Sequence, residues 1–401
     1  MSQSSELAKE FYINTSISDG FDRLTILKVK QKKLKNEKKL LEIKKEKELL
    51  EKNLEIYFND TTNYYYRILF LVNEKIWDLL DEAKYNSSNN DIALKNFQAQ
   101  EDYNERRFRI KKKIDNFLNS DIKEQKGYKK KKAFVLGHLG LGDHGYLNAM
   151  YRYIATIYDE TYVVCKKSYL KNVEIFFGDD PSIIPYPCKD DMSDVCVHHG
   201  CSIADLKKIT EGMDVYLSGG HMINRSKYRV YEYPYSFYDD VNIPRNIFWN
   251  YSHFSAIQND LYKLINGQKY IFIHNTSSDY PNGVYSIEQV EKHFKISKNE
   301  VLFVNPCINI YSENHPFYHQ ANKFLGYKLP ELIELIEKAD YVSLSDSSFL
   351  GMAFHLNIKT DNCIYIGRGG ACYNHLYNDQ NKSNILPNKM NKFKKQLWHT
   401  K

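Results

Sequence analysis

The hydrophobic positions of residues 21–118 follow a helical period, and this stretch contains no Gly or Pro. Two sets of apolar residues recur at heptad spacing, one after the other: Leu27, Leu34 and Leu41, then Ile43, Leu50 and Tyr57. Because a strict coiled coil keeps one phase, residues 21–58 predict a short or imperfect coiled coil, or a long helix packed on the neighbouring domain. Further along, we expect a buried helix at 64–80, a loop at 84–91 and a third helix at 92–118.

The pattern changes at Gly127, after which short apolar runs alternate with helical segments. Such alternation is typical of βαβ units and a parallel sheet. A first cycle has expected strands at 133–136, 161–165, 183–186, 194–198 and 214–218, and helices at 146–157 and 203–210. A second has strands at 269–275, 300–305, 341–344 and 362–366, and helices at 286–294, 329–339 and 347–356. The aromatic, Pro-containing segment 228–254 between them indicates a connector rather than a core unit.

These two cycles predict an α/β protein with two Rossmann-like doubly wound domains, preceded by an α-helical, partly coiled-coil region. The expected division is 1–126 for the helical region, 127–255 for the first Rossmann-like domain and 256–401 for the second. Two such domains would face each other across a cleft, with ligands at the carboxyl ends of their strands.

Composition narrows the class of protein. Hydrophobic residues make up 42% of the 401 positions, which is enough for real cores, and the net charge of +6 is concentrated in the N-terminal Lys-rich helix and at 129–132. This is a local surface property and not a nucleic-acid-binding composition. The seven cysteines lack framework spacing, no signal-peptide pattern opens the chain, and the most apolar segment, 64–72, is too short to cross a membrane. We therefore expect a soluble, cytoplasmic protein, and the richness in Lys, Asn, Ile and Tyr suits an AT-rich genome, such as that of a large DNA virus.

A strand, a glycine loop and a helix-like run follow one another in residues 132–157. After Gly140 and Gly142 come Asp143 and His144. Such a unit directs backbone N–H groups and the positive end of a helix dipole to one point, which suits a polar or anionic ligand. Asp143 and His144 add two groups able to move protons there. A purely structural tight turn is the alternative interpretation of the same glycines.

A second candidate site lies between a strand and a helix, at Ser343-Leu344-Ser345-Asp346-Ser347-Ser348. The hydroxyls of Ser347 and Ser348 lie near a helix start, where they either cap the helix or hold a pyrophosphate. Arg368, in the segment 367–370 after the last strand, is placed to neutralise diphosphate charge, with a flexible turn as the alternative.

The chain resembles GT-B glycosyltransferases in these motifs and in their order, over about residues 133–372. The closest likeness is to ADP-heptose:lipopolysaccharide heptosyltransferases and to related bacterial and viral glycosyltransferase-like proteins. The matching motifs are Gly140-Leu141-Gly142-Asp143-His144, the segments 170–174 and 179–181, Ser236-Phe237-Tyr238 followed by Ile243-Pro244, Tyr270-Ile271-Phe272-Ile273-His274, and the helix, strand and Asp-Ser-Ser around 331–348. Heptosyltransferases carry a His where this chain has Gly351, and a Lys in the loop where it has 276–279.

The resemblance implies roles for individual residues. Asp143 would lie on the acceptor side, in the loop with Gly140 and Gly142, as the general base that takes a proton from an acceptor hydroxyl. His144 is the rival base, because imidazole ordinarily titrates near neutrality. The implied donor and phosphate-binding residues are His274, Asn275, Ser345, Asp346, Ser347, Ser348 and Arg368.

No metal site is predicted. Five residues of the types that bind zinc lie within a short span: Cys188, Cys196, His198, His199 and Cys201. They lack a paired Cys-x-x-Cys, so we expect free thiols and loop histidines. The acidic pairs at 179–180 and 190–191 are expected to be loop or cap residues, and the tyrosines 233, 235 and 238 to pack in a core rather than stack on a sugar.

The sequence therefore predicts a glycosyltransferase that transfers a sugar from a nucleotide-diphosphate donor to a hydroxyl acceptor, inverting and metal-independent, with no cofactor besides the nucleotide-sugar substrate. The expected partners are a glycan, lipid or protein acceptor and a second copy bound through the N-terminal helices. One alternative is a catalytically silent GT-B scaffold assembling through those helices, which the absent Lys and His favour. A dinucleotide-dependent oxidoreductase is disfavoured, because Cys165-Lys166-Lys167 replaces the acidic residue expected at the end of the second strand.

Overall fold

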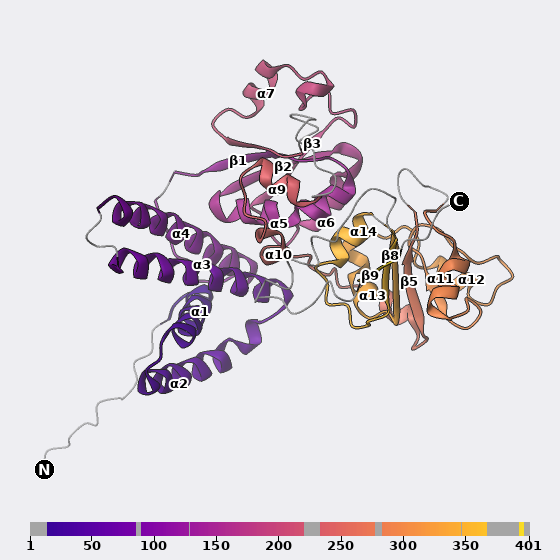
Figure 1. Ribbon diagram of the computed structural model, residues 1–401, viewed down its shortest axis with the longest axis horizontal. Helices are drawn as coiled ribbons and strands as arrows, with labels where there is room; N and C mark the ends of the chain where they lie inside the picture. Colours follow the sequence, from indigo (N-terminus) through magenta and orange to yellow (C-terminus); the bar gives the residue numbers. More distant parts are fainter. Residues whose placement is uncertain are drawn as a thin grey trace, which may run out of the picture. The chain divides into compact units, whose positions relative to one another are not determined.

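The chain divides into two units, Met1–Lys129 and Lys130–Lys401, the first helical and the second α/β (Figure 1). The computed structural model describes residues 14–85, 90–127, 129–219, 233–276, 283–345 and 347–366, and the backbone of 393–396.

Four helices build the helical unit: α1 (Ile17–Lys33), α2 (Glu37–Leu54), α3 (Asp60–Tyr85) and α4 (Asn90–Phe117), with a short 3-10 turn η1 (Glu55–Tyr57) between α2 and α3. The helix expected over 21–58 is not continuous, because the side chain of Asn36 accepts a hydrogen bond from the Lys39 amide and starts a new helix. The heptad residues do not share one buried face, since Leu27 is 1% exposed and Leu41 is 55% exposed. The buried helix expected at 64–80 is confirmed as part of α3.

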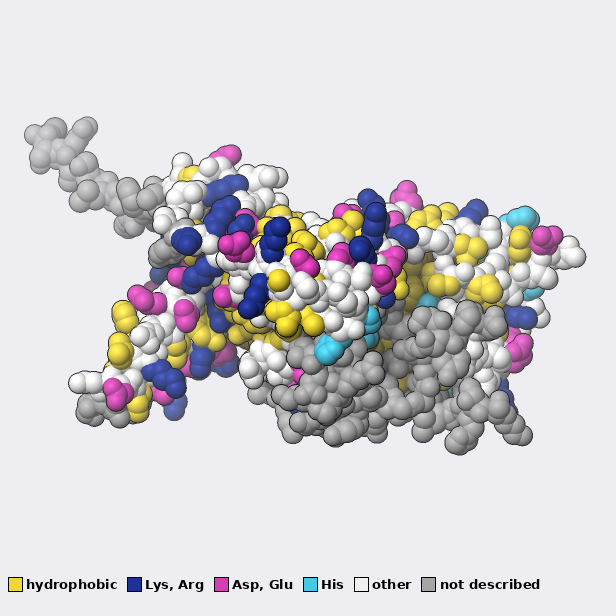
Figure 2. Space-filling model, turned by 90° about the horizontal axis from the view of Figure 1, so that it is seen from above, with side chains coloured by type: hydrophobic (Ala, Val, Ile, Leu, Met, Phe, Trp, Pro, Cys, Tyr) yellow, Lys and Arg dark blue, Asp and Glu magenta, His cyan; other side chains and the backbone are white. Residues whose placement is uncertain are grey.

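The core of the helical unit lies between α1, α3 and α4, which pack against one another. Its fully buried apolar residues include Phe21, Leu24, Ile68, Leu69, Val72, Ile110 and Ile114. The lysines cover the outside, where they pair with Glu and Asp, as Lys32 does with Glu74 at 2.6 Å. Figure 2 shows positive and negative side chains mixed over the helical unit, on the left of that view. The lysine clusters of this unit therefore form a solvated face on which acidic side chains neutralise part of the positive charge.

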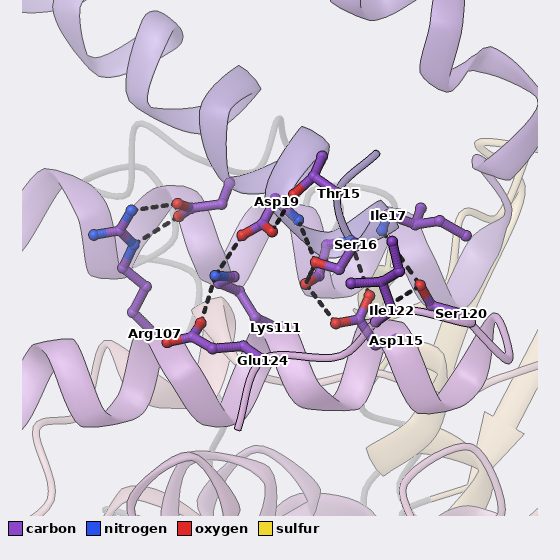
Figure 3. A network of polar contacts seen from close by, with 12 residues as sticks. Thr15, Ser16, Ile17, Asp19, Arg107, Lys111, Asp115, Ser120, Ile122 and Glu124 are labelled. Atoms are coloured by element: carbon purple, nitrogen blue, oxygen red, sulfur yellow. Dashed lines mark hydrogen bonds and ion pairs between the residues drawn. The ribbon is translucent and has the colours of Figure 1, made fainter. Parts of the chain in front are cut away.

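A polar network ties the start of α1 to the end of α4 and to the segment that follows (Figure 3). Asp115, 1% exposed, accepts hydrogen bonds from the amide of Ser18 at 3.0 Å and from its hydroxyl at 2.7 Å. The Lys111 ammonium lies 2.6 Å from a carboxylate oxygen of Asp19 and 2.6 Å from one of Glu124. These contacts join segments about a hundred residues apart in the chain, and so close the helical unit.

The first sheet of the α/β unit is parallel, with strand order β3-β2-β1-β4. Its strands are β1 (Lys132–Leu136), β2 (Glu160–Lys166), β3 (Ile183–Cys188) and β4 (Asp214–Leu217). The connecting helices are α5 (Leu141–Ile157), α6 (Leu170–Phe176) and α7 (Ile203–Ile209), with the 3-10 turns η2 (Lys167–Tyr169) and η3 (Val197–His199). Because β2 and β4 flank β1, the chain reverses direction across the sheet between β1 and β4.

The second sheet is also parallel, with order β6-β5-β7-β8-β9. Its strands are β5 (Tyr270–His274), β6 (Leu302–Val304), β7 (Tyr341–Ser345), β8 (Cys363–Ile366) and β9 (Phe393–Gln396), the last of which was not expected. The helical segments between and before them are η6 (Leu261–Ile265), α11 (Ile287–Phe294), α12 (Tyr318–Asn322), η7 (Leu329–Leu332), α13 (Ile333–Glu337) and α14 (Ser348–Ala353). Two parallel sheets with intervening helices confirm the α/β class.

Three expectations in the α/β unit are wrong. Residues 194–198 form no strand, because the Cys196 amide bonds back to the Met192 carbonyl at 3.0 Å and a 3-10 turn follows. The described part of segment 228–254 is core rather than a connector: it holds α9 (Tyr235–Asp240) and α10 (Ile247–Asn250), and Phe237 and Phe248 are 0% exposed. Helix α5 begins at Leu141, five residues before the expected start, so Asp143 and His144 belong to its first turn.

Replacing Asp115 by Ala tests the polar network. The change leaves the amide and hydroxyl of Ser18 without their acceptor, and it should lower the free energy of unfolding of the helical unit by about 2–3 kcal/mol. Hydrogen exchange at the Ser18 amide and thermal unfolding of the full chain measure this. Asp102→Ala, at an exposed position of the same helix, is the control. Unchanged exchange at Ser18 in the Asp115 variant would contradict the assigned role.

Candidate active site

The carboxyl end of β1 and the first turn of α5 bring two ionisable side chains together. Oδ2 of Asp143 contacts Nδ1 of His138, and Oδ1 accepts a hydrogen bond from the Tyr233 hydroxyl at 2.9 Å. Asp143 is 8% exposed, whereas the side chain of His138 is 36% exposed. The carboxylate is thus buried, with one hydrogen bond at each oxygen, and the imidazole beside it is partly exposed to solvent.

The pKa of Asp143 is lowered. Burial acts to raise it, but the hydrogen bond and charge of His138 and the hydrogen bond from Tyr233 outweigh burial. A carboxyl group with a depressed pKa stays ionised and is a weak proton acceptor. The geometry of Asp143 is that of a group that orients an imidazole.

His138 and the hydrogen bond of Tyr233 were missed by sequence reasoning. His138 stands two residues after β1, at the carboxyl end of a strand in a parallel sheet, which is the one signal that could have singled it out. Its ring stacks on that of Phe237, with centroids 5.9 Å apart and planes inclined by 22°. The contact with Phe237 and the bond to Asp143 fix the plane of the imidazole.

His144, the rival base, lies inside the core. It is 0% exposed, its Nδ1 is 3.5 Å from the Tyr151 hydroxyl, and burial lowers its pKa to about 4. At neutral pH this ring is uncharged. A side chain with no exposed surface does not contact a substrate, so the geometry separates His144 from the Asp143 site although the two are adjacent in sequence.

The two candidate loops meet through a glycine. A Cβ atom on Gly142 would lie 3.3 Å from the backbone nitrogen of Ser348 and 3.7 Å from the carbonyl carbon of Ser347. The first turns of α5 and α14 therefore touch, backbone to backbone. Gly140 has a different function: a Cβ there would lie 2.6 Å from Oδ2 of Asp143, so its absence leaves room for the carboxylate.

His274 lies behind Ser347, at the end of β5. It is 6% exposed, burial lowers its pKa to about 4, and its Nδ1 is 3.0 Å from Oγ of Ser347 and 3.3 Å from Oγ of Ser345. The Ser345 hydroxyl donates to the Thr276 carbonyl at 2.9 Å. Nδ1 of His274 is nearer to the Ser347 oxygen than to the Ser345 oxygen, and the direction of its bond with Ser347 depends on the tautomer of the ring.

The other predicted donor residues divide into three cases. Ser348, partly exposed, opens α14 beside Ser347 and shares the contact with Gly142. The side chain of Asn275 bonds within the protein: its Nδ2 donates to the Tyr285 carbonyl and its Oδ1 accepts from the side chain of Asn305, both at 3.0 Å. Asp346 and Arg368 lie outside the described residues.

Among the residues that the structure describes, no group of three or more His, Cys, Asp or Glu side chains is arranged to hold a metal ion. Cys188, Cys196 and Cys201 are buried free thiols. The arrangement as a whole pairs a carboxylate-oriented imidazole from one sheet with partly exposed serine hydroxyls from the other. Such a site can accept a proton on one side and bind an acidic or polyhydroxylated group on the other.

These features define an α/β protein that carries polar side chains at the carboxyl ends of two parallel sheets, joined to a helical unit. Residues 11–134 match the model of a family of unknown function, DUF6165, so the match covers the helical region and less than half of the chain. No curated protein matches the chain.

Two solved structures are similar over part of the chain. One is a bacterial iron-containing dodecameric glycosyltransferase, TibC, from enterotoxigenic E. coli, with a TM-score of 0.34, 14% identity, and coverage of 62% of this chain and 61% of that one. The other is a glycosyl transferase family 9 protein from Veillonella parvula, with a TM-score of 0.37, 10% identity, and coverage of 64% and 92%. The chain thus spans about three fifths of TibC, and at these TM-scores neither similarity carries an argument about the site.

In the described part of the chain, no helix combines the length and the apolar character needed to cross a bilayer.

The two buried histidines predict a loss of stability in acid. In the unfolded chain an imidazole takes up its proton near the ordinary value of 6.5, whereas His144 and His274 do so at about 4 in the folded protein. Stability is therefore complete above pH 6.5 and is lost as the pH falls toward 4, by roughly 3 kcal/mol per histidine. Denaturant titrations at pH 7, 6 and 5 measure this slope. It should flatten in His144→Gln and His274→Gln but not in His319→Gln, at an exposed position; equal slopes in all four proteins would refute the assignment.

Proposed function

We propose that the α/β unit is a glycosyltransferase that moves a sugar from a nucleotide-diphosphate donor to an acceptor hydroxyl, in a GT-B-like arrangement of its two sheets. One observation carries the proposal: the contact of Gly142 with Ser347 and Ser348 puts the His138–Asp143 pair and a set of serine hydroxyls at one place in the fold. The motif order along residues 133–372 supports it independently of the geometry.

In this proposal His138 is the general base and Asp143 is a positioning residue. Asp143 holds the Nδ1 proton of the imidazole, which leaves Nε2 as the basic atom. Nε2 takes the proton of the acceptor hydroxyl as its oxygen forms a bond to the anomeric carbon. The bond from that carbon to the diphosphate oxygen breaks, and the nucleoside diphosphate leaves with the electron pair. Attack opposite to the leaving group inverts the anomeric centre.

The donor diphosphate is proposed to bind at Ser347 and Ser348. In this proposal Nδ1 of His274 carries the proton and donates to the Ser347 oxygen, 3.0 Å away, so that the Ser347 hydroxyl proton is directed to a phosphate oxygen. His274 is neutral and buried, so it acts by orienting Ser347 and adds no positive charge. Asp346 and Arg368 keep their proposed place beside the phosphates on sequence grounds alone.

Replacing His138 by Gln tests the base. The change removes the proton acceptor but keeps a polar side chain, and it should lower kcat about 10²–10⁴-fold with any nucleotide sugar that the protein uses. Asp143→Asn should produce a similar loss, while Tyr233→Phe, which removes one hydrogen bond to Asp143, should cost about tenfold. Turnover is measured by release of nucleoside diphosphate across a panel of nucleotide sugars.

His199→Gln, at an exposed position of the same unit, is the matched control and should retain full turnover. If the His138 variant kept its activity while Asp143→Asn lost it, Asp143 would be the base after all. Absence of turnover with every nucleotide sugar, together with unchanged biological function in both variants, would favour the non-catalytic scaffold.

Replacing Ser347 by Ala tests the donor site separately from the chemistry. Losing one hydroxyl donor to a charged oxygen should weaken binding of a nucleoside diphosphate about 10- to 100-fold. Calorimetric titration with ADP, GDP and UDP gives the dissociation constants, and Ser312→Ala, at an exposed serine of the same unit, should bind as the natural protein does. Equal affinity in the Ser347 variant would remove this residue from the donor site.

A further inference from the structure

A recess lies at the carboxyl edge of the first sheet, between the ends of β1 and β4, where the strand order reverses. It has a volume of about 150 Å³ and is lined by the last residues of the two strands, Leu136 and Leu217, and by Ser218. Ligands of open α/β sheets bind outside the carboxyl ends of the strands at such a reversal. The position is therefore that of a ligand site rather than of a packing defect.

The walls of this recess are aliphatic. Val195, Val197 and Leu206 close it from the side of η3 and α7, together with the thiol of Cys196. The Ser218 hydroxyl, 0% exposed, donates to the Phe237 carbonyl at 2.8 Å, so its proton is already used within the protein. His198 lies at the exposed rim. An occupant therefore finds apolar contacts inside and polar groups only at the rim.

The recess opens to solvent beside Val197 as well as beside His198. Val197 is 45% exposed, although it lines the recess, and an exposed valine at the mouth of an aliphatic recess extends its apolar surface outward. An apolar cavity of roughly 150 Å³ takes up a molecule the size of benzene, that is, about six carbon atoms. The capacity therefore corresponds to the end of an alkyl or prenyl chain.

The recess is close to the proposed base. Leu136 in its wall and His138 are two residues apart, so their Cα atoms lie within about 7 Å of each other. We propose that this recess binds an aliphatic chain of the acceptor, so that the acceptor is lipid-linked and its hydroxyl lies at His138. The identification of the bound molecule as the acceptor rests on the proposed glycosyl transfer. The binding of an aliphatic chain in the recess is independent of that function.

The test uses the full-length protein and n-alkyl β-glucosides from methyl to octyl, below the concentrations at which they aggregate. Calorimetric or NMR titration gives an affinity for each chain length. Burying one methylene group corresponds to about a fourfold gain. Affinity should therefore rise about fourfold per carbon up to about six carbons and then level off. An affinity independent of chain length would overturn the proposal.

Two variants connect the effect to the recess. Val197→Asp, at a position 45% exposed, should remove most of the chain-length dependence, whereas Val215→Asp, a valine 42% exposed and not in the lining, should leave it intact. Leu206→Ala removes three carbons from the wall and should move the plateau to longer chains by about three carbons. A plateau that stays in place, or equal loss in both aspartate variants, would contradict the assignment.

Two further results separate this proposal from glycosyl transfer. Chain-length-dependent binding without turnover with any nucleotide sugar would support aliphatic binding in the recess and contradict the enzymatic function. Equal turnover of methyl and hexyl acceptors would support glycosyl transfer and contradict a role of the recess in binding the acceptor. Tighter binding of short peptides bearing Leu or Phe than of hexyl glucoside would make the acceptor a protein and overturn the lipid assignment.

Discussion

The contact between the first turns of α5 and α14 is the constraint on which the candidate active site depends. A Cβ at position 142 would lie 3.3 Å from the nearest backbone atom, the Ser348 nitrogen, which is closer than ordinary van der Waals contact. Backbone atoms move aside less readily than a flexible side chain, so the approach favours glycine. Two turns that come from different sheets, about two hundred residues apart in the chain, thereby supply their side chains to one region.

A histidine from a neighbouring segment contacts each of these two turns. On the α14 side, His274 at the end of β5 is buried, burial lowers its pKa, and its Nδ1 lies 3.0 Å from the Ser347 oxygen. On the α5 side, His138 is partly exposed and held by an ionised carboxylate. Burial distinguishes the two histidines: His274 is desolvated, which disfavours its charged form, whereas His138 is partly exposed and lies beside the Asp143 carboxylate.

The elements of the fold that depend on local pattern could be predicted, and those that depend on distant partners could not. Continuous apolar runs such as Ile271–Ile273, all 0% exposed, identify buried parallel strands without further information. Residues 194–198 carry the same signal by coincidence, because Val195 is buried while Val197 lies at 45% exposure on a turn. The break between α1 and α2 follows from Asn36, a capping residue that a heptad count overlooks.

The candidate active site shows the same division. The glycine loop and the Ser347–Ser348 pair could be found from sequence, since their residue types mark the ends of strands. The role of Asp143 could not, because it depends on Tyr233, ninety residues away along the chain, whose hydroxyl bonds to Oδ1. With Oδ1 bound to Tyr233 and Oδ2 to His138, the carboxylate has a lowered pKa and both of its oxygens engaged. A carboxylate in that state orients its neighbour better than it removes a proton from a hydroxyl, which is why the proposed transfer assigns the base to the imidazole and not to Asp143.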